Sequence, residues 1–144
     1  MKISTRGRYA LRLMLDLALY GQEEPVRLRD VAKRQEISVK YLEQIISTLQ
    51  KAGDVRSVRG AQGGYLLARS PEQYTVGMIL RRIEGDLAPV SCLAGEVNEC
   101  PRQGYCVTLR LWKELDEAIQ GVVDRYTLAD LVEWSHGMAS DFVI

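Results

Sequence analysis

Apolar residues recur at helical spacing along most of the chain and predict a mainly α-helical protein. The first such stretch runs from Ser4 to Tyr20, where apolar side chains occupy two opposite sides. A helix with two apolar faces is buried on both, so we expect one face in the core and the other against a second subunit. Gly21 follows directly and predicts the end of this helix.

Two further helices are predicted, over residues 28–35 and from a cap at Ser38 to about residue 51. The second carries an inward apolar stripe of Leu42, Ile45, Ile46 and Leu49. Polar residues occupy its other faces and therefore project outward. Two helices joined by a tight turn are typical of a helix-turn-helix, whose second helix enters the major groove of DNA.

A β-hairpin is predicted next, from strand-like runs at 55–59 and 65–68 separated by five residues that include three glycines. Such a hairpin is the wing of a winged helix, and Arg59 at its tip can approach phosphates or a narrow minor groove. A glycine-rich loop can also cradle a nucleotide phosphate. That reading is disfavoured because a strand follows this loop instead of a helix N-terminus.

The C-terminal half is predicted to contain a helix over 76–84 capped by Thr75, an aperiodic loop over 85–106 and a long helix. An unstructured loop of this length indicates a function. The long helix carries an apolar stripe over about five turns, formed by Trp112, Leu115, Ile119, Val122 and Tyr126. Pairing with the same helix of a second chain would bury this stripe, with packing inside the protomer as the alternative. A short helix over 128–134 and a loose tail are expected to follow.

Composition adds a charge asymmetry to this picture. The chain has 144 residues, 47% hydrophobic and 26% charged, which is typical of one compact globular domain with an appendage and excludes a large two-domain enzyme. The net charge is zero, but residues 1–69 hold 13 Lys or Arg against 7 Asp or Glu, whereas residues 70–144 hold 6 against 12. A basic half favours a nucleic-acid partner over an ordinary solvated surface. Arg12 and Asp16 interrupt the first apolar segment, so we expect no membrane span and a cytoplasmic protein.

The chain has three cysteines, Cys92, Cys100 and Cys106, and all lie in the long loop. Thiolates grouped on a pliable segment can converge on a soft metal centre. Their spacings differ from the close Cys-x-x-Cys pairs of zinc ribbons, so an iron–sulfur cluster is favoured over structural zinc. A metal-free thiol switch remains the other alternative.

Three segments together resemble the Rrf2 family of bacterial regulators: MKISTRGRYAL at the start, ISVKYLEQ from Ile37 and VRGAQGGY from Val58. The resemblance extends from Met1 to about Trp134. It implies a homodimeric winged-helix repressor or activator whose DNA is read by the helix that starts near Ser38 and by the wing arginine. The long C-terminal helix forms the dimer in that family.

The three cysteines before the long helix are similar to those of the family branch that senses through an iron–sulfur cluster, which includes IscR and NsrR. The family's cysteine-metabolism repressor lacks them. The resemblance implies that the cysteines ligate a 2Fe–2S or 4Fe–4S cluster, but the usual fourth ligand is missing. IscR-like proteins have a histidine where this chain has Leu109, and NsrR-like proteins an acidic residue where it has Arg8. Glu96 and Glu99 are local candidates or else solvated carboxylates, and His136 is interpreted as a surface residue beyond the last helix.

We therefore expect a DNA-binding domain over 1–84, a cluster loop over 85–106 and a dimerisation helix with its tail over 107–144. The expected function is a homodimeric, iron–sulfur-sensing transcriptional regulator of a palindromic double-stranded operator. The residues expected to contact DNA are Ser38, Lys40, Tyr41, Glu43, Gln44 and Arg59. Helix packing is the alternative for Tyr41, and a surface ion pair is the alternative for Glu43.

Two other functions remain open. One is a cluster-free regulator that uses thiols or zinc and is controlled by a partner protein. The other is a redox enzyme, which is disfavoured because no adjacent histidine or acid–base pair accompanies the cysteines.

Overall fold

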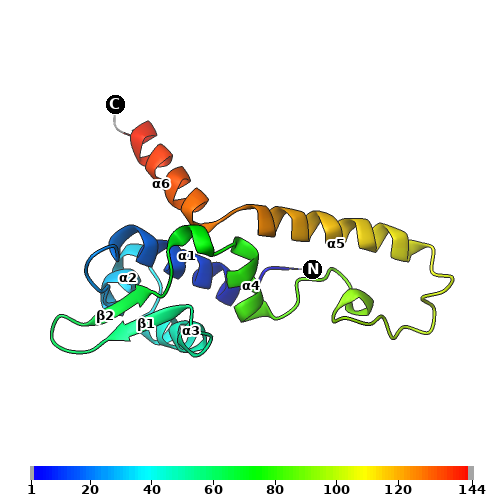
Figure 1. Ribbon diagram of the computed structural model, residues 1–144, viewed down its shortest axis with the longest axis horizontal. Coiled ribbons are helices and arrows are strands. Elements are labelled where there is room, and N and C mark those ends of the chain that lie inside the picture. The colour runs from blue at the N-terminus through cyan, green and yellow to red at the C-terminus, as the bar shows by residue number, and fades with distance from the viewer. Residues whose placement is uncertain (1, 143–144) are drawn as a thin grey trace.

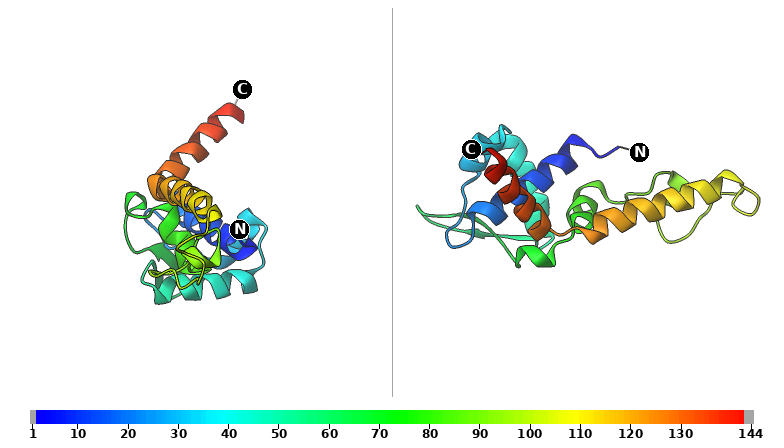
Figure 2. Two further views of the ribbon diagram at one scale, coloured as in Figure 1. Left: turned by 90° about the vertical axis from the view of Figure 1, so that its right-hand side faces the viewer. Right: turned by 90° about the horizontal axis from the view of Figure 1, so that it is seen from above.

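The computed structural model describes residues 2–142, which form a mainly helical winged helix-turn-helix with a two-stranded sheet (Figure 1). The elements in chain order are α1 (Thr5–Tyr20), α2 (Leu28–Gln35), α3 (Val39–Lys51), β1 (Val55–Val58), β2 (Gly64–Leu67), the 3₁₀ turn η1 (Pro71–Gln73), α4 (Val76–Glu84), the 3₁₀ turn η2 (Ser91–Leu93), α5 (Thr108–Arg125) and α6 (Leu128–Phe142). Elements α1 to α4 form a body. Helix α5 projects from it, and α6 leaves the body in another direction (Figures 1 and 2).

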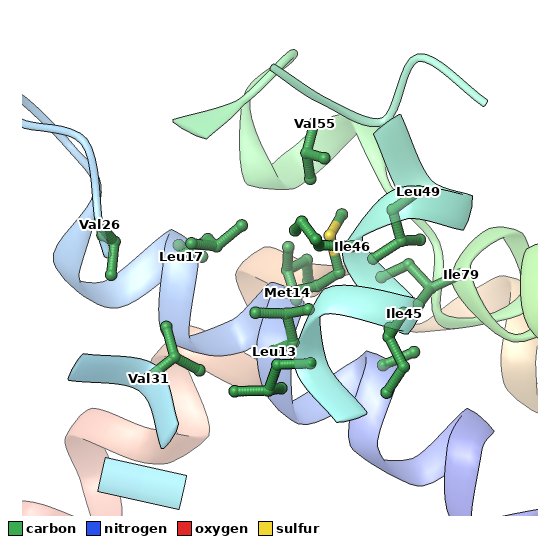
Figure 3. Packing of buried hydrophobic residues seen from close by; sticks show 14 of the residues in the cluster. Leu13, Met14, Leu17, Val26, Val31, Ile45, Ile46, Leu49, Val55 and Ile79 are labelled. Atoms are coloured by element: carbon green, nitrogen blue, oxygen red, sulfur yellow. The ribbon is translucent and has the colours of Figure 1, made fainter. Parts of the chain in front are cut away.

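Helix α1 is the centre of the body. Its N-terminus is capped by Ser4, whose hydroxyl accepts a hydrogen bond from the Gly7 amide at 3.0 Å. It contacts α2, α3, α4, α6 and β2 of its own chain. One face supplies fully buried core residues such as Leu13 and Leu17 (Figure 3). The leucines of the opposite face are half-buried, so neighbours within the chain cover part of the second apolar face.

The helix-turn-helix forms as its capping and periodicity predict. Ser38 accepts a hydrogen bond from the Tyr41 amide at 3.2 Å, and Glu36 makes the turn in the left-handed conformation (φ 57°). The predicted inward stripe of α3 is buried throughout, and three of its residues are labelled in Figure 3. This packing fixes which face of α3 remains free.

The wing is an antiparallel hairpin in which Val55 pairs with Leu67 and Val58 with Gly64. A backbone bridge joins it to the segment before α2: the Val26 amide donates to the Tyr65 carbonyl at 2.9 Å, and the Tyr65 amide donates to the Val26 carbonyl at 2.8 Å. Gly64 is required at this contact, because a Cβ there would lie 2.4 Å from the Val26 carbonyl oxygen. The bridge therefore positions the wing relative to the helices.

Two expectations about the C-terminus are wrong. The last helix does not stop near residue 134 but continues to Phe142, so His136 lies within it. Gly137 is a weak helix former, but Met138 and Ala139 favour a helix and no proline interrupts this segment, so the helix continues. Tyr126 is not part of the long helix: it caps α5 in an extended conformation, and its ring packs 5.0 Å from that of Trp134.

Helix α6 begins with a capping interaction that fixes its start. The Thr127 amide donates to the Asp130 carboxylate at 2.8 Å, and the Asp130 amide donates to the Thr127 hydroxyl at 3.2 Å. Leu128 is fully buried and belongs to the body's core. Within residues 2–142, no helix combines the length and apolar character needed to cross a membrane.

Candidate nucleic-acid interface and cysteine segment

The free face of α3 presents the polar side chains predicted to contact DNA. Lys40, Glu43 and Gln44 are exposed, and Ser38 is exposed at the cap. Glu43 has no ion-pair partner among residues 2–142, which disfavours the surface ion pair considered for it. The first turns of α3 therefore offer donors and acceptors suited to base edges.

Tyr41 differs from these neighbours because it is half-buried. Its ring lies 5.5 Å from that of Tyr9 on α1, in an edge-to-face arrangement at 77°. A second contact between the same helices joins the Arg6 guanidinium to the Thr48 hydroxyl at 3.1 Å. Tyr41 thus takes part in packing that holds α3 against the N-terminal part of α1. Its contact with DNA stays a prediction.

The wing tip carries Arg59, which is exposed, next to Gly60 in a left-handed conformation (φ 109°). The Arg27 guanidinium donates a hydrogen bond to the Ala61 carbonyl and so links the tip to the start of α2. The wing that carries Arg59 is consequently held at its base by the Val26–Tyr65 bridge and at its tip by Arg27.

The position of α2 depends on an ion pair between a buried carboxylate and a partly exposed arginine, which sequence reasoning missed. Asp16 is fully buried in α1 and accepts hydrogen bonds from Arg34 Nε at 3.0 Å, Arg34 Nη2 at 2.7 Å and Gln35 Nε2 at 3.0 Å. The hydrogen bond to Asp16 raises the pKa of the Arg34 guanidinium. An acidic residue among the apolar positions of α1, with basic residues in the last turn of α2, was the available signal.

A second buried carboxylate joins the wing to α4. Asp54 precedes β1 and binds Arg69 at 2.8 Å and Arg82 at 2.9 Å. The Tyr74 hydroxyl donates to the Asp54 carbonyl at 2.6 Å and accepts hydrogen bonds from the Ala68 and Arg69 amides. Both carboxylate oxygens of Asp54 and the Tyr74 hydroxyl therefore have hydrogen-bond partners. Such a complete network favours a rigid base of the wing.

An ion pair with α4 joins the C-terminal end of α5 to the body. Arg81 binds both carboxylate oxygens of Asp124, at 2.7 and 2.9 Å, and also contacts Gln120. This guanidinium lowers the pKa of the Asp124 carboxyl. Of the predicted apolar stripe of α5, Leu115 and Val122 are 38% and 48% exposed, whereas Trp112 and Ile119 are half-buried, so the stripe is only partly covered in a single chain. Leu111, beside the stripe, is 56% exposed.

Residues 85–106 run beside α5, and we refer to them as the cysteine segment (Figure 1). Asp86 organises its first part by accepting hydrogen bonds from the Ala88 amide at 2.7 Å and the Gly95 amide at 2.9 Å, and these bonds lower the pKa of its carboxyl. Leu87 is buried. Apart from η2, the segment has no regular helix or strand, which agrees with the predicted loop.

The structure brings two of the three thiols together. Cys92 and Cys100 line one surface hollow of about 300 Å³ with Glu99, whereas Cys106 lies at the start of α5 outside that hollow. All three are free and partly exposed. Over residues 2–142, no three His, Cys, Asp or Glu side chains are arranged to hold a metal ion.

Cys106 has an environment that favours its thiolate. The Thr108 hydroxyl lies 3.4 Å from its sulfur, and this contact, with the backbone amides of Leu109 and Thr108 and the charge of Arg102, lowers the pKa of the thiol. Three thiols on a segment with little regular structure are chemically suited to an iron–sulfur cluster. The donor set therefore fits such a group, and the third thiol must approach the other two to complete it.

The cysteine segment begins next to a contact with α1 that the sequence did not indicate. Glu84, the last residue of α4, accepts hydrogen bonds from the Ser4 amide at 3.1 Å and from the Ser4 hydroxyl. Gly7 leaves space for this carboxylate, since a Cβ there would lie 2.2 Å from Glu84 Oε1. The end of α4 and the start of α1 are thus joined.

Comparison with known proteins agrees with this geometry. The Rrf2 family, described as "Iron-dependent Transcriptional regulator", matches residues 3–134. Protein rrf2 of Nitratidesulfovibrio vulgaris is 46% identical over 92% of this chain and 87% of its own, and the HTH-type transcriptional regulator IscR of Serratia proteamaculans is 42% identical over 92% and 79%.

Solved structures show the same relationship. CymR, the global cysteine regulator of B. subtilis, superposes with a TM-score of 0.79 at 38% identity, covering 93% of this chain and 98% of its own. IscR of T. potens superposes with a TM-score of 0.75 at 41% identity, covering 94% and 88%. The family description and the name of IscR are those of transcriptional regulators, so the chain is assigned to regulators and not to enzymes. The chain belongs to the Rrf2 family of winged-helix transcriptional regulators.

Proposed function

We propose that the chain acts as a homodimeric DNA-binding regulator that senses redox, iron or iron–sulfur status through a cluster ligated by Cys92, Cys100 and Cys106. The observation that carries this proposal is the position of the three thiols. They lie in the one segment that connects the DNA-binding body to the projecting helix α5. The family description as iron-dependent and the similarity to IscR support the choice of iron.

The proposed DNA-binding unit is residues 1–84. Its α3 enters the major groove, with Lys40, Tyr41, Glu43 and Gln44 of its first turns facing the bases and Ser38 at the phosphates. Arg59 reaches the minor groove or the backbone from the wing. The rigid connections of the wing and of α2 to α1 support this assignment, because they preset the distance between the two contact points.

Dimerisation is assigned to residues 107–144. The exposed apolar side chains of α5 form the surface that a second copy would cover, and Trp134 and Met138 of α6, 51% and 61% exposed, extend the apolar surface of this region. Two-fold pairing places two α3 helices in successive major grooves, which requires a palindromic operator with half-sites about one helical turn apart.

Residues 85–106 form the proposed sensing segment. A bound cluster supplies a group whose presence and oxidation state respond to iron and oxidants. This chain's own residues supply the coupling: Asp86 organises the first part of the segment through the Ala88 and Gly95 amides, Leu87 is buried, and Arg81 fixes α5 to α4 through Asp124. A few kcal/mol of differential stability between two arrangements of α5 is within the usual range of coupling energies.

Anaerobic reconstitution with iron and sulfide tests this function. We expect a coloured protein with stoichiometric iron and sulfide, and operator affinity in a gel-shift assay that differs between the cluster-bound and metal-free forms. The triple Cys→Ala variant should lose the colour and should bind the operator with the same affinity before and after the reconstitution treatment. A protein that stays colourless, or an affinity unaffected by the cluster, contradicts the proposal.

A cluster-free regulator is the second candidate, favoured by the similarity to CymR and by the separation of Cys106 from the other two thiols. In that case the thiols, or zinc, would respond to oxidants or to a partner protein. Metal analysis of the anaerobically purified protein distinguishes the two functions, because this candidate requires an iron content near zero.

A further inference from the structure

The proposed cluster has three thiolate ligands and lacks the fourth ligand of its relatives. Leu109, at the position of a histidine in IscR-like proteins, is 8% exposed and has no donor atom. Arg8, at the position of an acidic residue in NsrR-like proteins, has no lone pair to offer and donates to the Thr5 hydroxyl at 2.9 Å. A fourth ligand supplied by this chain therefore has to be a different residue.

The hollow that contains two of the thiols also contains one carboxylate. It is lined by Ser91, Cys92, Ala94, Val97, Glu99 and Cys100. Glu99 is the one acidic residue among these, and its side chain is exposed. Glu96, three residues earlier, is outside the hollow. The structure thus distinguishes Glu99, which lines the hollow, from Glu96, which does not. Sequence spacing alone left both as candidates.

A turn fixes Glu99 beside this thiol pair. The Asn98 side-chain oxygen accepts a hydrogen bond from the Cys100 amide at 2.9 Å, which closes an Asx turn around Glu99. The Gln103 amide donates to the Cys100 carbonyl at 3.2 Å and continues this local structure. The backbones of Glu99 and Cys100 consequently belong to one small, hydrogen-bonded turn.

We propose that the Glu99 carboxylate is the oxygen ligand that completes the Cys92, Cys100 and Cys106 set, an assignment that rests on the proposed function. Ser91 is the other oxygen-bearing side chain in the hollow, but a neutral hydroxyl is a weaker metal ligand than a carboxylate, which offers two acceptor oxygens. A carboxylate is a harder donor than thiolate or imidazole, so the iron that it binds is the chemically distinct and most exchangeable one.

Spectroscopy of the full-length protein, reconstituted anaerobically with ⁵⁷Fe and sulfide, tests the assignment. Glu99→Gln should change the Mössbauer signal of one iron site, shift the electron paramagnetic resonance of the reduced cluster and speed iron loss to a chelator at least about tenfold. Glu99→Cys should restore slow loss with an all-thiolate spectrum. The matched controls, Glu96→Gln and Ser91→Ala, should retain the wild-type spectra.

The outcomes separate this assignment from the proposed function. If the wild-type protein takes up a cluster and Glu99→Gln has the same spectra and loss rate, or if either control variant changes them instead, Glu99 is not the ligand. If the wild-type protein takes up no cluster, the proposed function fails and the assignment fails with it. Circular dichroism of each variant confirms that it is folded.

Discussion

The Asp16→Asn substitution removes the charge of a fully buried carboxylate that holds α2 against α1. Its oxygens accept three hydrogen bonds, two from Arg34 and one from Gln35. Asparagine keeps one acceptor oxygen but places an N–H group where the second oxygen was. A donor would then face the guanidinium or the glutamine amide, and at least one buried hydrogen bond would be lost.

The size of the effect follows from the exposure of Arg34. Removing one partner of a buried ion pair costs about 3–5 kcal/mol of unfolding free energy. The Arg34 side chain is 32% exposed and its guanidinium lies 4.0 Å from the Tyr20 ring centroid, so water and the ring continue to stabilise the cation. We therefore expect the lower end of that range, about 3 kcal/mol.

Urea unfolding followed by far-ultraviolet circular dichroism, at one fixed protein concentration, measures this loss. A double-mutant cycle with Arg34→Gln should give a coupling free energy of at least about 1 kcal/mol. Asp30→Asn, on the exposed first turn of α2, is the matched control and should change stability by no more than about 0.5 kcal/mol. An Asp16→Asn protein within about 0.5 kcal/mol of the wild type, or a coupling near zero, would refute the reasoning.

Three further predictions concern the wing and the thiols. Gly64→Ala should break the two backbone hydrogen bonds to Val26, cost about 2 kcal/mol of unfolding free energy and weaken operator binding measured by fluorescence anisotropy; unchanged binding would contradict the role of this bridge. Arg59→Ala should lower operator affinity and reduce the slope of log affinity against log salt by about one, and an unaltered slope would remove the phosphate contact. In the metal-free protein, the pKa of the Cys106 thiol is lowered, so the pH midpoint of its alkylation rate should lie below that of free cysteine. Thr108→Val should raise this midpoint. A midpoint unchanged by Thr108→Val would exclude the Thr108 hydroxyl as the cause of the lowered pKa.

The helix-turn-helix and the wing could be predicted because their signals are local. Ser38 caps a backbone amide three residues away, and the stripe of α3 repeats every three or four residues. The buried pair of Asp16 and Arg34 depends on contacts between two helices, and an acidic residue in an apolar helix was interpreted only as an interruption. The length of α6 was underestimated because its last turns lack the apolar periodicity that marked the other helices.

The candidate site could be predicted in its chemistry but not in its arrangement. The grouping of three cysteines in one loop identifies a soft donor set. Which glutamate lines the hollow shared by Cys92 and Cys100 is decided by the fold of the segment, which no spacing rule supplies. The half-buried state of Tyr41 likewise follows from Tyr9 on another helix, so its exposure could not be read from the pattern of α3 alone.

The contact between Glu84 and Ser4 has a mechanical consequence. Glu84 ends α4, and Gly85, the next residue, has a positive φ of 80° and begins the thiol-bearing stretch. Under the proposed function, a rearrangement of that stretch would act on the N-terminal end of α1 through Glu84 and Ser4, and the same end of α1 carries Arg6 and Tyr9, which contact α3. This route runs through one hydrogen-bonded contact, so a small movement of the cysteine segment could change the position of α3 without a rearrangement of the buried core.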